Sequence, residues 1–357
     1  MRYKLLGKSG LRVSELCLGT MTFGEEWGWG ASKDESRRIF EAYAEAGGNF
    51  IDTANMYTNG TSEKMVGEFV AKDRGRFVIA TKYTFPIREK DPNSGGNHRK
   101  SLVQSVERSL TNMKLDYIDL LWVHAWDELT PVEEVMRALD DLVQAGKVLY
   151  VGVSDYPAWL VARANTLAEF KGWTSFVALQ IEYSLVERTP ERDLIPMARM
   201  FGLTVTPWSP LGGGVLTGKY NNGGGKDVKE ARLSSQWQHL LSKRNLAIAG
   251  TVLDVALETG RSASQVALAW IRAQGPDMIP IFGSRRLAQI KDNMACLDLT
   301  LTPAQLKRLD EASAIDLGFP HDFLASDRIR GMLSAGAFDQ IDKDHIPGLR
   351  PTIPLKT

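Results

Sequence analysis

The sequence predicts an α/β fold in which eight parallel strands and their helices close into a (β/α)8 TIM barrel. Short apolar runs recur along the chain and are nearly continuous rather than alternating, as expected of strands buried on both faces. Segments with helix start signals lie between these runs. Eight strand–helix units in succession make a barrel.

The strands are expected at eight places in the chain. The runs are LCLG (16–19), NFID (49–52), FVIATK (77–82), YIDLLWVH (117–124), LYVGVS (149–154), FVALQIEY (176–183), LTVTPWS (203–209) and MIPIFG (278–283). Before the first run, YKLLGKSGLRV places a glycine-containing turn between two apolar segments, which predicts an N-terminal β-hairpin.

Capping residues and prolines mark where the helices should begin. A serine or threonine stands three residues before a glutamate or glutamine in several places, and prolines stand at four of the expected starts. The expected starts are Ser32 to Glu35, Thr130-Pro131, Asp155-Tyr156-Pro157, Thr189-Pro190, Ser262 to Gln265 and Thr302 to Gln305. Gly47-Gly48 should end the first helix.

A doubly wound open sheet is the alternative fold. Such a sheet usually carries a G-x-G-x-x-G turn after its first strand, and the segment LGTMTFG (18–24) does not match that pattern. The length of 357 residues also allows two domains, but one enlarged barrel accommodates it. We expect a single domain over 1–357, with two additions at the active-site end: a long loop between strands seven and eight, including Asn221 to Gly225, and a C-terminal extension, 318–357.

Composition excludes several classes of protein. Lys and Arg total 43, as do Asp and Glu, so bulk charge would not hold nucleic acid. No stretch approaches 18 apolar residues and the first ten residues lack the apolar core of a signal peptide, so we expect a cytoplasmic protein without membrane contact. The two cysteines, Cys17 and Cys296, are too few for a disulfide framework and too far apart for a metal knuckle. We expect no metal site and two buried thiols.

Polar residues end the apolar strands, and this is where barrels of this type place their active sites. The strand ends are Gly19-Thr20, Asp52, Lys82, His124, Ser154, Gln180, Ser209 and Gly283-Ser284. Asp52, Lys82 and His124 end neighbouring strands and should converge in one pocket. An aspartate and a lysine buried there must pair, because either charge alone is expensive to desolvate.

Tyr57 lies five residues after Asp52, close enough to fold back over this pocket. An ammonium at Lys82 would stabilise the phenolate and move Tyr57 toward the working range of a general acid, while His124 would orient a substrate oxygen. This set suits the polarisation of a carbonyl group. Alternatively, Asp52 and Lys82 form a structural ion pair and His124 is a core histidine.

These residues resemble the aldo-keto reductase family. The shared features include Gly48, Asp52-Thr53-Ala54 and Tyr57, with Lys82 and His124 at strand ends. The similarity continues through Gly152-Val153-Ser154, Gln180, Trp208 to Gly214, Leu216 to Lys219, Ile279-Pro280 and Gly283 to Asn293. The resemblance implies an NAD(P)H-dependent reductase of aldehydes or ketones, with Asp52, Tyr57, Lys82 and His124 as the catalytic tetrad, Tyr57 as proton donor and hydride passing directly from the nicotinamide.

The resemblance also implies where the cofactor lies. Ser154, Asp155 and Gln180 would hold the nicotinamide carboxamide, Trp208 would stack on its ring, and Thr20 and Asp52 would lie beside it. The pyrophosphate would follow Ser209, Pro210, Leu211, Gly212 and Gly214, whose glycines let the backbone approach and offer amide donors, with Lys219 beside the phosphates. Gly283, Ser284, Arg285, Gln289 and Asn293 would meet the adenosine part.

Three positions depart from the family's usual residues: Trp208 replaces a tyrosine, Asp155 an asparagine and Asp292 a glutamate. Arg285-Arg286 favours NADP(H) over NAD(H), because guanidinium binds phosphate with two parallel hydrogen bonds. Alternatively, these arginines are solvated charges at a helix start.

Trp27, Trp29 and Trp126 fall in loops where the substrate would lie, so an apolar or aryl carbonyl or alcohol is the expected small-molecule partner. Residues 91–100 resemble the corresponding loop of aryl-alcohol dehydrogenase-like members. The alternative is a cofactor-binding regulatory subunit similar to potassium-channel β subunits, which would be expected to carry a distinct N-terminal extension. The sequence leaves monomer and homo-oligomer open.

Overall fold

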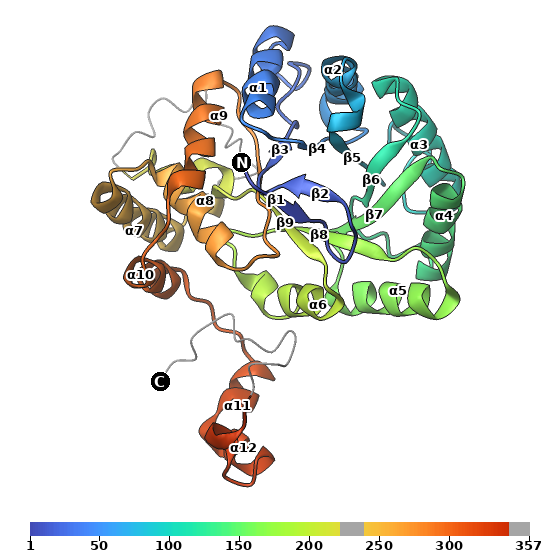
Figure 1. Cartoon of the computed structure of the whole chain (residues 1–357). Coiled ribbons are helices and arrows are strands. Elements are labelled where there is room, and N and C mark those ends of the chain that lie inside the picture. Colours follow the sequence, from blue (N-terminus) through green and yellow to red (C-terminus); the bar gives the residue numbers. More distant parts are fainter. Residues whose placement is uncertain (222–238, 343–357) are drawn as a thin grey trace.

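The computed structural model describes residues 1–221 and 239–342, and its centre is a ring of parallel strands (Figure 1). The strands are β3 (Cys17–Gly19), β4 (Phe50–Asp52), β5 (Val78–Tyr83), β6 (Ile118–Val123), β7 (Val148–Ser154), β8 (Phe176–Glu182), β9 (Thr204–Trp208) and β10 (Ile281–Phe282). They pair in the order β10-β3-β4-β5-β6-β7-β8-β9, and a parallel bridge between Val205 and Met278 joins the two ends of the sheet. Each strand overlaps a predicted run, and only β5 and β7 extend beyond theirs, by one residue each, so the barrel is confirmed.

Helices surround this ring on the outside (Figure 1). They are α1 (Lys33–Glu45), α2 (Thr61–Val70), α3 (Arg99–Met113), α4 (Val132–Gln144), α5 (Ala158–Lys171), α6 (Leu194–Phe201), α7 (Lys243–Thr259), α8 (Ala263–Ala273), α9 (Leu287–Met294) and α10 (Pro303–Ser313). The hydroxyls of Ser32, Ser262 and Thr302 cap α1, α8 and α10 as predicted, and Thr302 forms a complete capping box. None of the described helices has the length and apolar character needed to cross a membrane.

Two predicted helix starts are wrong in detail. Helix α4 begins after Pro131, which has no capping side chain, because the hydroxyl of Thr130 instead donates to Asp127 at 2.6 Å. Thr189-Pro190 opens only the short 3₁₀ helix η3 (Thr189–Glu191), and α6 starts afterwards. In both places the threonine hydroxyl bonds a nearby carboxylate instead of the helix backbone.

The segment between β9 and β10 contains more than a loop. It includes the 3₁₀ helix η4 (Gly212–Thr217) and the additional helix α7, which packs beside α8 and α10. Residues 222–238, with the predicted turn at Gly223 to Gly225, lie outside the described part of the chain.

The predicted N-terminal hairpin closes one end of the barrel. Strands β1 (Tyr3–Leu5) and β2 (Arg12–Ser14) pair antiparallel and lie across the ring in Figure 1. Leu6 and Val13 are fully buried and join the barrel interior beside Trp122. Because the hairpin fills this end, the carboxyl ends of the strands form the end that remains for a site.

The C-terminal extension does not cover that end over its described part. Helices α11 (His321–Ala325) and α12 (Asp327–Leu333) lie outside the ring of helices, beyond α10 (Figure 1). Neither helix has a buried residue, and Phe319 is 85% exposed. The expectation that the tail folds over the active-site end is therefore wrong for 318–342, because its apolar side chains do not pack on the barrel rim; 343–357 lie outside the described residues.

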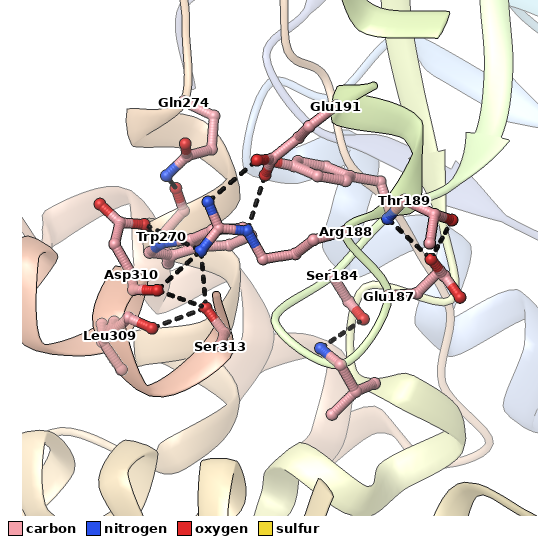
Figure 2. A network of polar contacts seen from close by, with 12 residues as sticks. Ser184, Glu187, Arg188, Thr189, Glu191, Trp270, Gln274, Leu309, Asp310 and Ser313 are labelled. Carbon is pink, nitrogen blue, oxygen red and sulfur yellow. Dashed lines mark hydrogen bonds and ion pairs between the residues drawn. The ribbon is translucent and has the colours of Figure 1, made fainter. Parts of the chain in front are cut away.

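A buried arginine ties the segment after β8 to two distant helices (Figure 2). Arg188 is 1% exposed and donates to both carboxylate oxygens of Glu191, at 2.7 and 3.0 Å. Its other terminal nitrogen donates at 2.9 Å to the carbonyl of Asp310 and to the hydroxyl of Ser313, both on α10. The guanidinium also lies over the ring of Trp270 on α8, 5.3 Å from its centroid. This network holds the rim segment in place.

We expect Glu191→Gln to lower the free energy of unfolding by about 3 kcal/mol, because it removes the carboxylate that accepts two hydrogen bonds from the buried Arg188 cation and leaves the more distant Asp310 carboxylate, at 3.6 Å. Urea denaturation followed by circular dichroism measures the change. Glu311→Gln is the matched control, since Glu311 and Lys307 form an exposed pair whose loss should cost less than about 1 kcal/mol. Equal losses in the two variants would contradict the structural role of Arg188.

Candidate active site

The ends of β4 and β5 bring a buried acid and a buried base together. Lys82 is fully buried and Asp52 is 3% exposed, and Lys82 Nζ lies 2.5 Å from Asp52 Oδ2. The ammonium also donates to the carbonyl of Thr53 at 2.8 Å. Burial alone would lower the pKa of Lys82, but the charge of Asp52 and the nearby Tyr57 outweigh it and raise that pKa. Lys82 is thus a fixed positive charge.

A tight turn after β4 returns Tyr57 to this charge. Thr58 and Asn59 have φ values of 45° and 57°, in the left-handed region, and the hydroxyl of Thr58 donates to the carbonyl of Phe23 at 2.6 Å. Tyr57 Oη accepts a hydrogen bond from Lys82 Nζ at 3.0 Å. Lys82 therefore bonds both Asp52 and the phenol, as the sequence predicted.

His124, directly after β6, completes the predicted group. Its ring lies edge-on to that of Tyr57, with centroids 6.0 Å apart, and edge-on to Phe85 at 4.6 Å. Burial, followed by the charge of Lys82, holds the pKa of His124 well below its usual range. The imidazole is therefore neutral near pH 7 and can donate a hydrogen bond from one nitrogen.

Gln180 contacts the Asp52 carboxylate, in addition to the cofactor role predicted for it. Its Nε2 donates to Asp52 Oδ1 at 3.0 Å, so it positions the carboxylate that pairs with Lys82. Thr20, on the next strand end, donates its hydroxyl to the carbonyl of Asp52 at 2.9 Å. The sequence placed both residues at strand ends but could not show these bonds, which join segments far apart in the chain.

The end of β7 and the end of β9 meet beside this group. Ser154 pairs in register with Gln180, and Asp155 follows with a φ of 49°. Trp208 Nε1 donates to Asp155 Oδ1 at 3.1 Å, so two of the three departures from the usual family residues form a pair. Asp155 is exposed as a residue, but burial of its carboxyl group raises the pKa of that group to about 6. The hydrogen bond from Trp208 opposes this shift.

The segment after β9 runs close to the barrel and uses several left-handed residues. Ser209, Gly212, Gly213 and Gly214 have φ values of 53°, 54°, 63° and 96°. The N–H groups of the three glycines donate to Ser209 and Leu211, at 2.8, 3.3 and 2.9 Å. The expectation that these glycines present free amide donors is therefore wrong in this conformation: they supply the tight turn and a bare backbone surface instead. Pro210 lies within the same turn.

Two cations from distant segments lie near the glycine turn. The pKa of Lys219 is lowered by burial and then by the charge of Arg285, which places the two positive groups within one field. The Lys219 ammonium also lies 3.2 Å from where a side chain on Gly214 would begin. Two positive groups beside a turn of bare backbone suit a bound phosphate.

The predicted adenosine-side residues gather around β10 and α9. A side chain on Gly283 would meet the carbonyl of Gly19 at 2.9 Å, so only glycine fits there. The backbone N–H of Arg285 donates to Gln289 Oε1 at 3.0 Å, while Ser284 and Asn293 are buried. Asp292, the third departure, does not face this group: its carboxylate accepts bonds from Ser262 and Gln265 at the start of α8.

The structure brings one of the three predicted substrate tryptophans to Tyr57. Trp27 lies edge-on to Tyr57 with centroids 6.3 Å apart, and Trp29 packs against Trp27 at 5.7 Å. Trp126 lies elsewhere on the rim, 40% exposed, in the wall of a cavity of about 460 Å³ that Asp155 and Trp208 also line.

Two further predictions concern the cysteines and metal binding. Cys17 and Cys296 are free and buried, as predicted. Across the described ranges, no cluster of His, Cys, Asp and Glu has the arrangement of a metal site.

Comparisons with known proteins agree with this geometry. A family model described as the aldo/keto reductase family matches residues 15–314. A norsolorinic acid reductase of Aspergillus flavus is 39% identical over 336 residues, which cover 90% of this chain and 83% of that protein. An aldo-keto reductase of Aspergillus calidoustus is 38% identical over 91% of this chain and 85% of its own length. An aryl-alcohol dehydrogenase of Pestalotiopsis microspora is 36% identical over 90% of this chain and 85% of its own.

We expect the imidazole of His124 to remain neutral as the pH falls from 7.5 to 6.0, because burial and Lys82 disfavour its charged form. In histidine ring NMR spectra, the signal that is lost in His124→Gln should keep its chemical shift over this range. The unfolded chain takes up this proton at the ordinary histidine pKa, whereas the folded protein resists it. The stability of the fold therefore starts to fall as the pH drops through the ordinary histidine range, and it keeps falling until the folded imidazole titrates. A full shift centred at pH 6.5 would contradict the described environment.

Proposed function

The chain belongs to the aldo/keto reductase family, and from this premise we propose that it reduces an aldehyde or ketone to an alcohol with NADPH, using Tyr57 as the general acid. Its relatives' names support the coarser statement that it is an oxidoreductase. The observation that carries the finer proposal is the Lys82 ammonium, which contacts both the Asp52 carboxylate and the Tyr57 phenol.

Lys82 prepares Tyr57 to give up its proton. An ammonium that donates to a phenol oxygen stabilises the phenolate, so the phenol becomes a stronger acid. Asp52 keeps Lys82 charged, and Gln180 holds Asp52 through Oδ1. The hydroxyl of Tyr57 then protonates the carbonyl oxygen as the carbon is reduced, and the proton that Tyr57 loses is regained from solvent.

The neutral His124 serves as a hydrogen-bond donor to the same carbonyl oxygen. A neutral imidazole can orient and polarise that oxygen without competing with Tyr57 as the acid. The contact with Phe85 on one side of the imidazole limits the access of water to it.

The residues around the barrel rim fit a nicotinamide cofactor, which when bound supplies the hydride. Because Asp52 holds the amide nitrogen of Gln180, the Gln180 carbonyl oxygen is left to accept from a carboxamide. We place Ser154 and Asp155 beside the same group and Trp208 against the ring. Lys219 and Arg285 would bind phosphate oxygens, and Ser284, Gln289 and Asn293 would meet the adenosine part.

The substrate class follows from the aromatic side chains at the rim. Trp27 lies against Tyr57, and Trp29 extends this surface. These walls and the names of the relatives support an apolar or aryl carbonyl compound as substrate, with the corresponding alcohol in the reverse reaction. Trp126 would contact the outer part of a large substrate.

We expect Tyr57→Phe to lower kcat for aldehyde reduction by about 10²- to 10⁴-fold, because it removes the general acid and keeps the ring. The dissociation constant for NADPH, measured by fluorescence titration, should stay within about twofold. Turnover by Tyr57→Phe at the wild-type rate would refute the assignment. A wild-type protein that binds NADPH but reduces no compound in an aldehyde panel would favour the regulatory-subunit alternative.

We expect Arg285→Ala to weaken NADPH binding by about 10- to 100-fold, the value of one lost hydrogen bond between charged groups. Binding of NADH should change little, because it lacks the 2′-phosphate. Isothermal titration calorimetry with both cofactors measures the two constants. Arg12→Ala, in the hairpin at the closed end of the barrel, is the matched control. Equal affinity of the wild type for NADPH and NADH would contradict the NADP preference.

A further inference from the structure

A buried asparagine joins three of the loops at the open end of the barrel. Asn97 is fully buried, and its Oδ1 accepts a hydrogen bond from the hydroxyl of Thr84 at 2.6 Å. Its Nδ2 donates at 2.9 Å to the carbonyl of Ala125 and at 2.9 Å to the hydroxyl of Tyr156. Its backbone N–H donates to Asp127 Oδ2 at 2.9 Å. The partners of this one residue therefore come from the loops after β5, β6 and β7.

The first of these partners leads directly to His124. The hydroxyl oxygen of Thr84 accepts a hydrogen bond from the backbone N–H of His124 at 3.2 Å. Thr84 has a φ of 100°, which is costly for a β-branched residue and persists only where neighbours hold it. The carbonyl of Thr84 accepts from the N–H of Gly96 at 2.7 Å, so the Thr84 backbone and hydroxyl are both fixed by the segment that carries Asn97.

The segment that carries Asn97 lies so close to its neighbours that Gly95 and Gly96 have little room for side chains. A side chain on Gly96 would lie 2.9 Å from Asp127 Oδ2, and one on Gly95 would lie 3.2 Å from the Thr84 carbonyl oxygen. The two glycines thus allow Asn97 to reach between the loops. Asp127 adds bonds to the N–H of Leu129 and the hydroxyl of Thr130, which complete the connection to the loop after β6.

The His124 side chain has few contacts with the described residues that would hold it in place. Its Nδ1 is buried and has no hydrogen-bond partner among the described residues. The position of the imidazole is therefore set by its backbone and by ring contacts with Phe85 and Tyr57. Phe85 follows Thr84 directly in the chain, so the backbone restraint and the Phe85 contact both depend on how Thr84 is held.

We propose that Asn97 is a positioning residue that sets the place of His124 through the hydroxyl of Thr84. Through the carbonyl of Ala125 and through Asp127, it also fixes the loop that carries Trp126. The proposal rests on the proposed function only in giving His124 a role toward the substrate carbonyl. Displacement of such a group by about 1 Å can cost about 100-fold in rate, so small changes at Asn97 should affect turnover.

The test separates positioning from general stability through Thr84. Thr84→Val removes the hydroxyl but keeps the shape and branching, whereas Thr84→Ser keeps the hydroxyl. We expect Thr84→Val to lower kcat by about 10- to 100-fold, while Thr84→Ser returns it to within about threefold of wild type. NADPH affinity should be unchanged in both, because the proposed cofactor contacts come from other loops. Asn97→Ala should behave like Thr84→Val, provided it folds.

Thr174→Val is the matched control. It removes a comparable hydroxyl bond, from Thr174 to Asp140 at 3.0 Å, in the connection between α5 and β8. The kcat of Thr174→Val should equal that of the wild type, and its melting temperature should be similar to that of Thr84→Val. Equal kcat in Thr84→Val and Thr174→Val, or equal impairment in Thr84→Ser and Thr84→Val, would overturn the proposal.

A readout that does not need turnover distinguishes this proposal from the proposed function. The ring NMR signal of His124 should shift in Thr84→Val, return in Thr84→Ser and remain in place in Thr174→Val. If these NMR shifts are observed but the wild type reduces no aldehyde, the proposed function is refuted and the positioning role is supported. An unmoved His124 signal in Thr84→Val would refute the positioning role whatever the activity.

Discussion

The buried ammonium of Lys82 is the constraint on which the open end of the barrel depends. A cation with no exposed surface must have acceptors close by, and here they come from Asp52, Thr53 and Tyr57 on one short stretch of chain. The left-handed turn at Thr58 and Asn59 follows Tyr57, whose phenol contacts this ammonium. The arrangement that makes the buried charge tolerable also places the ammonium against the phenol oxygen, as the proposed acid role of Tyr57 requires.

Positive and acidic side chains occupy different parts of this end of the barrel, although the whole chain has equal numbers of basic and acidic residues. Lys219 and Arg285 share one positive field near the glycine turn. Asp155, which accepts a bond from Trp208, stands near Glu182, whose pKa is raised to about 7 by burial, by Glu187 and by Asp155. A bound molecule that spans the rim would therefore meet positive charge at one end and carboxyl groups at the other, which favours one orientation.

Local patterns in the sequence predicted the strands and the four residues around Tyr57, because continuous apolar runs and their polar ends are local signals. Features that depend on distant partners were not predictable. The bond from Gln180 to Asp52 crosses 128 positions, and the hydroxyl of Thr130 serves Asp127 instead of a helix. The tail was expected over the rim as an addition at the active-site end, yet Phe319 is exposed, since the position of a segment in the chain does not say which surface it meets.

The hairpin that closes the barrel also links the order of synthesis to the order of folding. The Lys4 ammonium donates to the carbonyl of Met278 at 2.8 Å, and Glu15 pairs with Arg272 at 2.9 Å. Lys4 and Glu15 therefore acquire these partners only after the more than 250 residues that separate each pair have been made. Such long-range closure makes folding slow and cooperative, and a growing chain must keep the apolar side of its hairpin, with Leu6 and Val13, from other contacts until β10 arrives.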